Sequence, residues 1–222
     1  MKESTKNIPT LNKKEMRSFT QKWVTEISKE FAEGFQFLEN YPKSITFFGG
    51  NQLKENNPYY ESARVLASRL VKELGCSIIS GGGPGIMEAA NRGAFEAGGS
   101  SLGLLIKLPG GQVTNGYVTE KFSTNYFFVR KVCLSFSAEA FIFYPGGFGT
   151  LDEFFEILTL IQTRKITHVP LICVGSEYWD ELKEFMKKEI LGRDAIKPED
   201  LNLFHIANDH DEIIEIIRKV AK

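Results

Sequence analysis

The chain has 222 residues, 42% of them hydrophobic, which is enough for the core of one ordinary globular domain. Its 27 Lys and Arg nearly balance 28 Asp and Glu, so the net charge of -1 gives no general reason to expect nucleic acid or a membrane surface as a partner. No stretch approaches the roughly 20 apolar residues that span a bilayer, and the N-terminus lacks the apolar segment of a signal peptide. We therefore expect a cytoplasmic protein.

The first predicted element is an amphipathic helix over residues 13–38. We expect it to pack onto the body of the protein or onto a partner subunit, as an N-terminal helical extension (1–40) ahead of one catalytic domain (41–222). Its apolar residues recur at steps of three and four, at Met16, Phe19, Trp23, Ile27, Phe31, Phe35 and Leu38.

After this helix, short apolar runs alternate with segments of helical spacing. Such runs are typical of strands buried on both faces, and the alternation predicts an α/β fold with a doubly wound parallel sheet. The predicted strands cover 44–50, 76–80, 101–106, 140–144 and 169–175. The predicted helices cover 59–74, 86–97, 125–136, 150–163, 177–191 and 210–221.

Two glycine-rich stretches lie where a predicted strand ends and the next helix begins, which is the edge at which parallel sheets bind ligands. Glycine lets the backbone approach a ligand closely, and the following helix offers free N–H groups and the positive end of its dipole. Two such loops favour anion binding, most simply phosphate, over turns in which glycine only relieves strain. The glycines are Gly81, Gly82, Gly83 and Gly85 in SGGGPGIMEAANRGA, and Gly146, Gly147 and Gly149 in FYPGGFGTLDEFFE.

Neither stretch is a standard NAD or ATP motif. The G-x-G-x-x-G fingerprint would need glycine at the positions of Ile86 or Asp152, and no glycine loop is followed by G-K-[S/T]. Conventional dinucleotide and ATP sites are therefore disfavoured.

The charged residues near these loops each have two interpretations. Thr150 and Glu153 fit the capping box T-x-x-E, so Glu153 is explained by helix capping as well as by catalysis, and Asp152 could complement the dipole of the first helical turn. Arg130 and Lys131 interrupt an apolar helical run, where they either meet a negative group or extend to the surface.

A metal site is disfavoured, because the five-residue gap between His205 and His210 gives no shared helix face. We expect a solvated turn there, before the last helix.

The stretches GGGPGIMEAANRGA, FFVRK and PGGFGTLDEFFE followed by TLIQTRKI resemble the LOG family of cytokinin riboside 5'-monophosphate phosphoribohydrolases, long labelled "lysine decarboxylase-like". The family hallmark is PGGxGTxxE with an upstream Arg-Lys pair, and the resemblance covers about residues 44–215. It implies a Rossmann-like sheet, a homodimer or larger homo-oligomer, and hydrolysis of a nucleoside 5'-monophosphate, AMP or N6-modified AMP, to free base and ribose 5-phosphate. The family's catalytic arginine and glutamate correspond to Arg130 and Glu153.

This resemblance also predicts which residues bind the substrate. A carboxylate near the anomeric carbon can stabilise an oxocarbenium-like state and activate water, while a protonated guanidinium can hold phosphate or stabilise the departing base. The scheme needs no metal and no cofactor. The predicted substrate-binding residues are Gly50, Gly82, Gly83, Gly85, Met87, Glu88, Lys131, Gly146, Gly147, Gly149 and Thr150.

Two other functions remain open. A nucleotide sensor or carrier could use the same pocket without catalysis. A decarboxylase that depends on pyridoxal phosphate would need a Schiff-base lysine, and only Lys131 and Lys165 lie near the glycine stretches.

Overall fold

In the computed structural model, the described residues are 13–108, 111, 113–136 and 138–220, and they form a seven-stranded sheet with the strand order β4-β3-β2-β1-β5-β6-β7. All neighbouring strands pair in parallel. The strands are β1 (Ser44–Phe48), β2 (Ser77–Ser80), β3 (Ser101–Ile106), β4 (Glu120–Thr124), β5 (Ala138–Phe143), β6 (Leu171–Cys173) and β7 (His205–Ile206).

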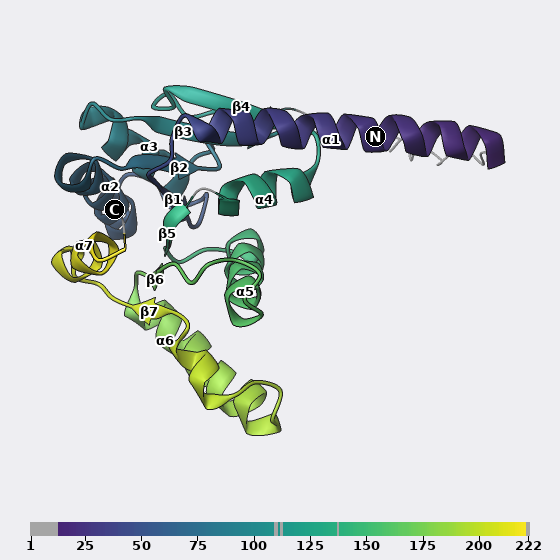
Figure 1. Cartoon of the computed structure of the whole chain (residues 1–222). Coiled ribbons are helices and arrows are strands. Elements are labelled where there is room, and N and C mark those ends of the chain that lie inside the picture. The colour runs from purple at the N-terminus through teal and green to yellow at the C-terminus, as the bar shows by residue number, and fades with distance from the viewer. Residues whose placement is uncertain (1–12, 109–110, 112, 137, 221–222) are drawn as a thin grey trace, which may run out of the picture.

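Helices cover both faces of this sheet, so the predicted α/β class and doubly wound parallel sheet are confirmed (Figure 1). The helices are α1 (Lys13–Glu39), α2 (Pro58–Leu74), α3 (Ile86–Glu96), α4 (Phe127–Phe136), α5 (Phe148–Gln162), α6 (Ser176–Phe185) and α7 (His210–Arg218). Helices α2, α3 and α7 share one apolar core with the sheet, whereas α1, α4, α5 and α6 share the core on the opposite face.

The strand order places the switch point of the sheet between β1 and β5. From β1 the chain adds β2, β3 and β4 in one direction, and β5 then returns to the other side of β1. In open parallel sheets the loops that leave the carboxyl ends of such strands enclose the ligand site. Here those loops begin at Gly49 and Tyr144.

The five predicted strands and seven predicted helices are present within a few residues, but two strands were not predicted. β4 is an edge strand of sequence EKFST, whose side chains are mostly accessible, and it lacks an apolar run. β7 has only two residues, His205 and Ile206, which is too short for any periodicity. Among the described residues, no helix has the length and hydropathy needed to cross a membrane.

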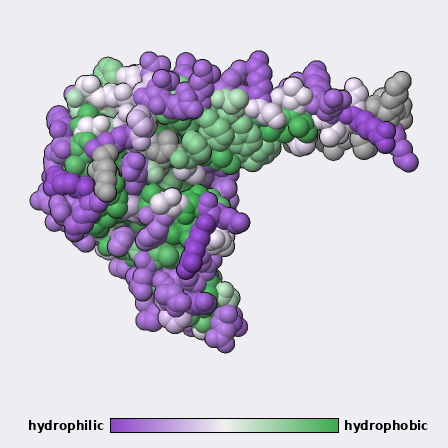
Figure 2. Space-filling model, viewed as in Figure 1, coloured by the Kyte–Doolittle hydropathy of each residue, from purple (hydrophilic) through white to green (hydrophobic). Residues whose placement is uncertain are grey.

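Helix α1 has two different halves. Its C-terminal half packs on the body, where Leu38 and Glu30 are buried, so the predicted contact with the body is confirmed. Its N-terminal half extends beyond the body (Figure 1), and Phe19 is exposed there. Trp23 is also partly exposed, but one edge contact joins its ring to that of Tyr126 on the body. Figure 2 shows a hydrophobic area where α1 and α4 meet, beside the hollow below α1.

Candidate functional site

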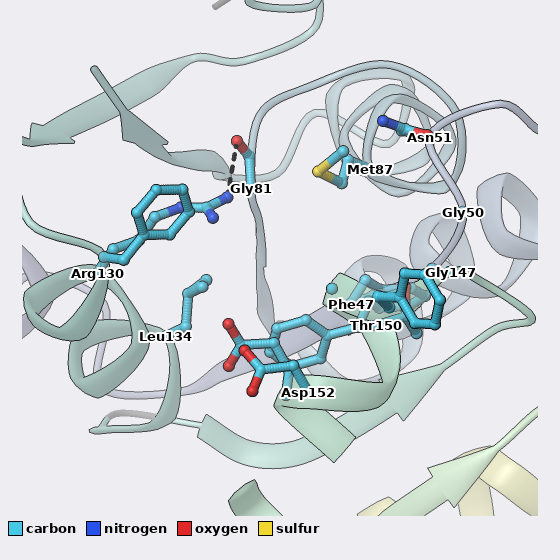
Figure 3. A pocket seen from close by; sticks show the side chains of 16 residues that line it. Phe47, Gly50, Asn51, Gly81, Met87, Arg130, Leu134, Gly147, Thr150 and Asp152 are labelled. Carbon is cyan, nitrogen blue, oxygen red and sulfur yellow. Dashed lines mark hydrogen bonds between the residues drawn. The ribbon is translucent and has the colours of Figure 1, made fainter. Parts of the chain in front are cut away.

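A cleft of about 390 Å³ lies at the switch point of the sheet. Its walls come from the loop after β1, the loop after β2, helix α4, and the loop and first turns of α5 (Figure 3). The volume is within the range of small-molecule sites. The predicted residues that line it are Gly50, Met87, Arg130, Gly147, Gly149, Thr150 and Glu153.

The backbone of Gly50 joins the three loops around this cleft. Its amide donates to the carbonyl of Pro145 over 2.9 Å, and its carbonyl accepts the amide proton of Ile86 over 3.1 Å. Gly85 has a φ of +73°, and a Cβ there would collide with the Gly50 carbonyl. The close approach of these backbones therefore requires glycine at position 85.

The remaining predicted binding residues lie beside the cleft and are not among the described residues that line it. The carbonyl groups of Gly82 and Gly83 face away, because they accept hydrogen bonds from the backbone and side chain of Asn115. Gly85 and Glu88 line a neighbouring hollow, where Tyr60 donates to Glu88 over 2.9 Å. Gly146 lies behind Thr150, against which a Cβ at position 146 would collide.

Arg130 lies in the cleft, so it does not extend to the surface as one interpretation allowed. Its Nε donates to the carbonyl of Leu104 over 2.7 Å, and one terminal nitrogen lies 3.5 Å from the carbonyl of Gly81 (Figure 3). A Cβ at Gly81 would collide with the guanidinium group, so this glycine makes room for Arg130. Burial lowers the pKa of Arg130, and the nearby Glu153 acts in the opposite direction.

The capping-box interpretation of Glu153 is wrong, because α5 starts two residues earlier than predicted. Its N-cap is Gly147, which places Glu153 six residues along the helix. Glu153 is buried, and none of the described residues gives its Oε2 a hydrogen-bond partner. Burial raises its pKa to about 7, Lys131 lowers it, and Glu156 raises it. The structure thus leaves a desolvated carboxylate at the cleft.

Lys131 points to the outer side of α5, where its Nζ lies 2.7 Å from carboxylate oxygens of both Asp152 and Glu156. Asp152 therefore pairs with a lysine, and it does not lie in the first helical turn as one interpretation proposed. Burial lowers the pKa of Lys131, but the two hydrogen-bonded carboxylates raise it more. A lysine held protonated in this way does not favour the Schiff base of the decarboxylase alternative. Lys165 lines a different hollow.

Several residues of the site were not predicted, among them Phe47, Phe48, Asn51 and Leu134 of the cleft lining. Tyr178 on α6 donates to the carbonyl of Gly146 over 2.9 Å, and Phe127 and Phe148 stand exposed at the mouth of the cleft. Tyr178 lies 32 residues beyond Gly146, so no local pattern links the two. Phe148 lies inside the glycine motif itself, and its exposure depends on where α5 begins.

His210 does not lie in a solvated turn, because it is the first residue of α7. Its Nε2 lies 2.9 Å from Ser62 Oγ, which also lies 2.9 Å from the hydroxyl of the buried Tyr144. Burial lowers the pKa of His210. Within the described part of the chain, no group of three or more His, Cys, Asp or Glu side chains is arranged to hold a metal ion.

Residues 87–217 match the model of a family described as "Possible lysine decarboxylase". A similar curated protein is the cytokinin riboside 5'-monophosphate phosphoribohydrolase LOG2 of Arabidopsis thaliana, 27% identical over 149 residues that make up 67% of this chain and 70% of that protein. The probable cytokinin riboside 5'-monophosphate phosphoribohydrolase LOG6 of the same plant is 30% identical over 150 residues, or 67% and 74% of the two chains.

Among solved structures, the fold is similar to that of the molybdenum cofactor carrier protein of Chlamydomonas reinhardtii. The TM-score is 0.59 at 23% identity, over 80% of this chain and 97% of that one. The molybdenum cofactor binding protein of Rippkaea orientalis gives a TM-score of 0.58 at 22% identity, over 81% and 98%. Identities this low support the shared Rossmann-like fold alone.

Proposed function

Because this chain belongs to the family described as possible lysine decarboxylases, to which the LOG phosphoribohydrolases are related, we propose that it hydrolyses the N-glycosidic bond of a nucleoside 5'-monophosphate. The substrate is AMP or an N6-modified AMP, and the products are the free base and ribose 5-phosphate. At the level of the family, the curated relatives are hydrolases by name.

The observation that carries this proposal is the carboxylate of Glu153. It is buried at the cleft with one oxygen that receives no hydrogen bond from the described residues, and burial raises its pKa to about 7. A carboxylate oxygen without a hydrogen-bond partner is available to take a proton from water and to face the positive charge that develops on the ribose ring. Near neutral pH a pKa of this size suits proton transfer in both directions.

Arg130 complements this carboxylate from the opposite wall. Its guanidinium remains protonated at neutral pH, and it is held by the carbonyl of Leu104. In the proposed reaction, water adds its hydroxyl group to the anomeric carbon as the bond to the base breaks. Glu153 accepts the proton of that water and passes it on to the departing base, so the carboxylate is ionised again at the end of the reaction. Arg130 stabilises the substrate phosphate or the charge on the departing base.

The 5'-phosphate is assigned to the start of α5. The first amides of a helix have no partner within it, and the helix dipole favours an anion there. A Cβ at Gly147 or Gly149 would meet no atom within 4 Å, so packing does not require glycine at either position. Both glycines line the cleft, and a bare backbone there leaves room for a bound phosphate.

The direct test is to incubate the protein with AMP, N6-modified AMP, other nucleoside monophosphates and adenosine, and to assay for free base. We expect base release from a monophosphate, with adenosine a very poor substrate because it lacks the phosphate contacts. Comparable cleavage of adenosine and AMP would contradict the phosphate assignment. Absence of base release from every nucleotide would contradict the hydrolase assignment.

A homodimer or larger homo-oligomer belongs to the same proposal. Large hydrophobic side chains are exposed on α1, α4 and α5, and monomers seldom expose an extensive apolar surface without a partner. Light scattering on the purified protein tests this, and a fully active monomer of 25.0 kDa would contradict it. The exposed residues are Phe19, Trp23, Val24, Phe127, Phe128, Val132, Phe136 and Phe148.

The alternative is a nucleotide sensor or carrier that uses the same cleft without catalysis. Proteins of similar fold are named as molybdenum cofactor carriers, which is the observation in its favour. Tight binding of a nucleotide without base release, across the same panel, would support this alternative over the hydrolase.

A further inference from the structure

Glu30 is a buried carboxylate on α1, far in sequence from the cleft, and only 6% of it is exposed. Its Oε1 accepts hydrogen bonds of 2.6 Å from both the backbone amide and the side-chain amide of Asn125. Its Oε2 accepts the amide proton of Tyr126 over 3.3 Å. A single glutamate thus binds the two residues that lead into α4.

These two residues control where α4 begins. The carbonyl of Tyr126 accepts the amide proton of Arg130 over 3.1 Å, which is a hydrogen bond of the first turn of this helix. Tyr126 is therefore held at its amide by Glu30 and at its carbonyl by Arg130. The negative charge of Glu30 also lies at the end of α4 where the helix dipole is positive.

The two helices are in close contact beyond this point. A Cβ on Gly34 would lie 2.7 Å from Sγ of Cys133, so a larger residue would push α1 away from α4. Phe35 of α1 packs against Phe136 of α4 with ring centroids 4.3 Å apart. Figure 1 shows the C-terminal half of α1 running alongside α4 on the body. Contacts of this kind fix the position of α4 as a whole.

We propose that Glu30 is a positioning residue for Arg130, and that α1 acts as a support that holds the guanidinium group in the cleft. Arg130 reaches Leu104 and Gly81 only if α4 starts at its present position, because the side chain leaves the first turns of the helix. Residue 30 lies outside the 87–217 region that the family model matches. This proposal rests on the proposed function only where its test measures turnover of AMP.

The test compares Glu30→Ala and Glu30→Gln with a matched control, Glu33→Gln. Glu33 lies on the same helix, is exposed, and is 3.7 Å from Lys29 in an ion pair that contributes little. All variants are assayed at a temperature where circular dichroism finds them folded. We expect kcat/KM for AMP to fall at least about tenfold in Glu30→Ala, since three hydrogen bonds to a charged group are lost, and less in Glu30→Gln. Glu33→Gln should match the wild type.

A double-mutant cycle with Arg130→Ala separates positioning from general stability. If Glu30 acts through Arg130, Glu30→Ala should have no further effect on turnover once Arg130 is absent. An equal loss in both backgrounds would overturn the proposal. Unchanged turnover of folded Glu30→Ala would also overturn it.

Hydrogen exchange keeps this test independent of the proposed function. Amides of residues 125–131 should exchange faster in Glu30→Ala than in Glu33→Gln, and unchanged exchange there would overturn the proposal. If the wild type releases no base, the hydrolase assignment fails, while faster exchange in this segment would still support the role of Glu30 in holding α4. In that case the double-mutant cycle compares AMP affinities, measured by calorimetry, in place of turnover.

Discussion

The hydroxyl group of Tyr178 donates a 2.9 Å hydrogen bond to the carbonyl oxygen of Gly146, in the loop that starts α5. Burial raises the pKa of Tyr178, so its hydroxyl group stays protonated and remains a donor at neutral pH. A side chain from α6 therefore holds the loop to which the substrate phosphate is assigned.

Replacement of Tyr178 by phenylalanine should loosen this loop and leave the rest of the cleft intact. A neutral hydrogen bond contributes about 0.5–1.5 kcal/mol, so the KM for AMP should rise roughly two- to tenfold, with a smaller change in kcat. Steady-state kinetics measure both parameters. A Tyr178→Phe enzyme with an unchanged KM would show that the loop does not depend on this contact.

The activity should rise with pH through the titration of Glu153. Burial raises the pKa of this carboxyl group to about 7, and the proposed mechanism needs its ionised form. The rate should therefore be low at pH 5, half-maximal near pH 7 and constant above pH 8, unless another group titrates there. A pH profile of kcat/KM checks this, and a profile that is already flat between pH 5 and pH 8 would contradict it.

The charge of Lys131 should determine the pH at which kcat/KM rises. Its positive charge lowers the pKa of Glu153, so Lys131→Gln should move the profile to higher pH. At pH 7 we expect turnover to fall about threefold or more, with a smaller loss at pH 9. Lys165→Gln is the matched control, because Lys165 lines a different hollow. Equal profiles for the two variants would exclude this role of Lys131.

Because Gly85 contacts Gly50, its replacement should lower the free energy of unfolding more than replacement of a glycine that has open space around it. Gly85 and Gly98 both have positive φ, but a Cβ at Gly98 meets no atom within 4 Å, whereas a Cβ at Gly85 collides with the Gly50 backbone. Gly98→Ala should cost about 1–2 kcal/mol of unfolding free energy from backbone strain, and Gly85→Ala clearly more. Urea denaturation measures both. Equal costs would contradict the close approach of the loops.

The sequence predicted most of the fold because hydrophobic periodicity marks each buried element. The strands β1, β3 and β5 are rich in apolar residues and are buried over nearly their whole length, as strands covered on both faces must be. The polar edge strand β4 carries no such signal, and its place depends on pairing with β3. Local pattern therefore identifies the interior of the sheet better than its edges.

The candidate site was only partly predictable, because several of its features depend on contacts between distant segments. Arg130, Glu153 and the second glycine loop stand out in the sequence, and the structure gathers them at one cleft. The capping-box interpretation of Glu153 was wrong because T-x-x-E spacing does not determine where a helix begins, and here the N-cap is Gly147. Tyr178 contacts Gly146 from 32 residues away, and Glu30 contacts Asn125 from 95 residues away. No local sequence pattern reveals contacts over such separations.

The most direct test of the central claim is Glu153→Gln, which keeps the shape of the side chain and removes its charge. The carboxyl group has a raised pKa in the folded protein, so its contribution to stability is present below its usual pKa and is lost as the pH rises through about 7. The glutamine variant should therefore be as stable as the wild type at pH 4, and more stable at pH 8 by up to about 3 kcal/mol.

The deciding measurement is base release from AMP by this variant at pH 8, with AMP affinity determined on the same sample. If Glu153 activates water and stabilises the developing charge, base release should fall at least about 100-fold while AMP still binds. Near-normal turnover by a folded Glu153→Gln protein would contradict the account, because the proposed hydrolysis would then proceed without the carboxylate on which it is built.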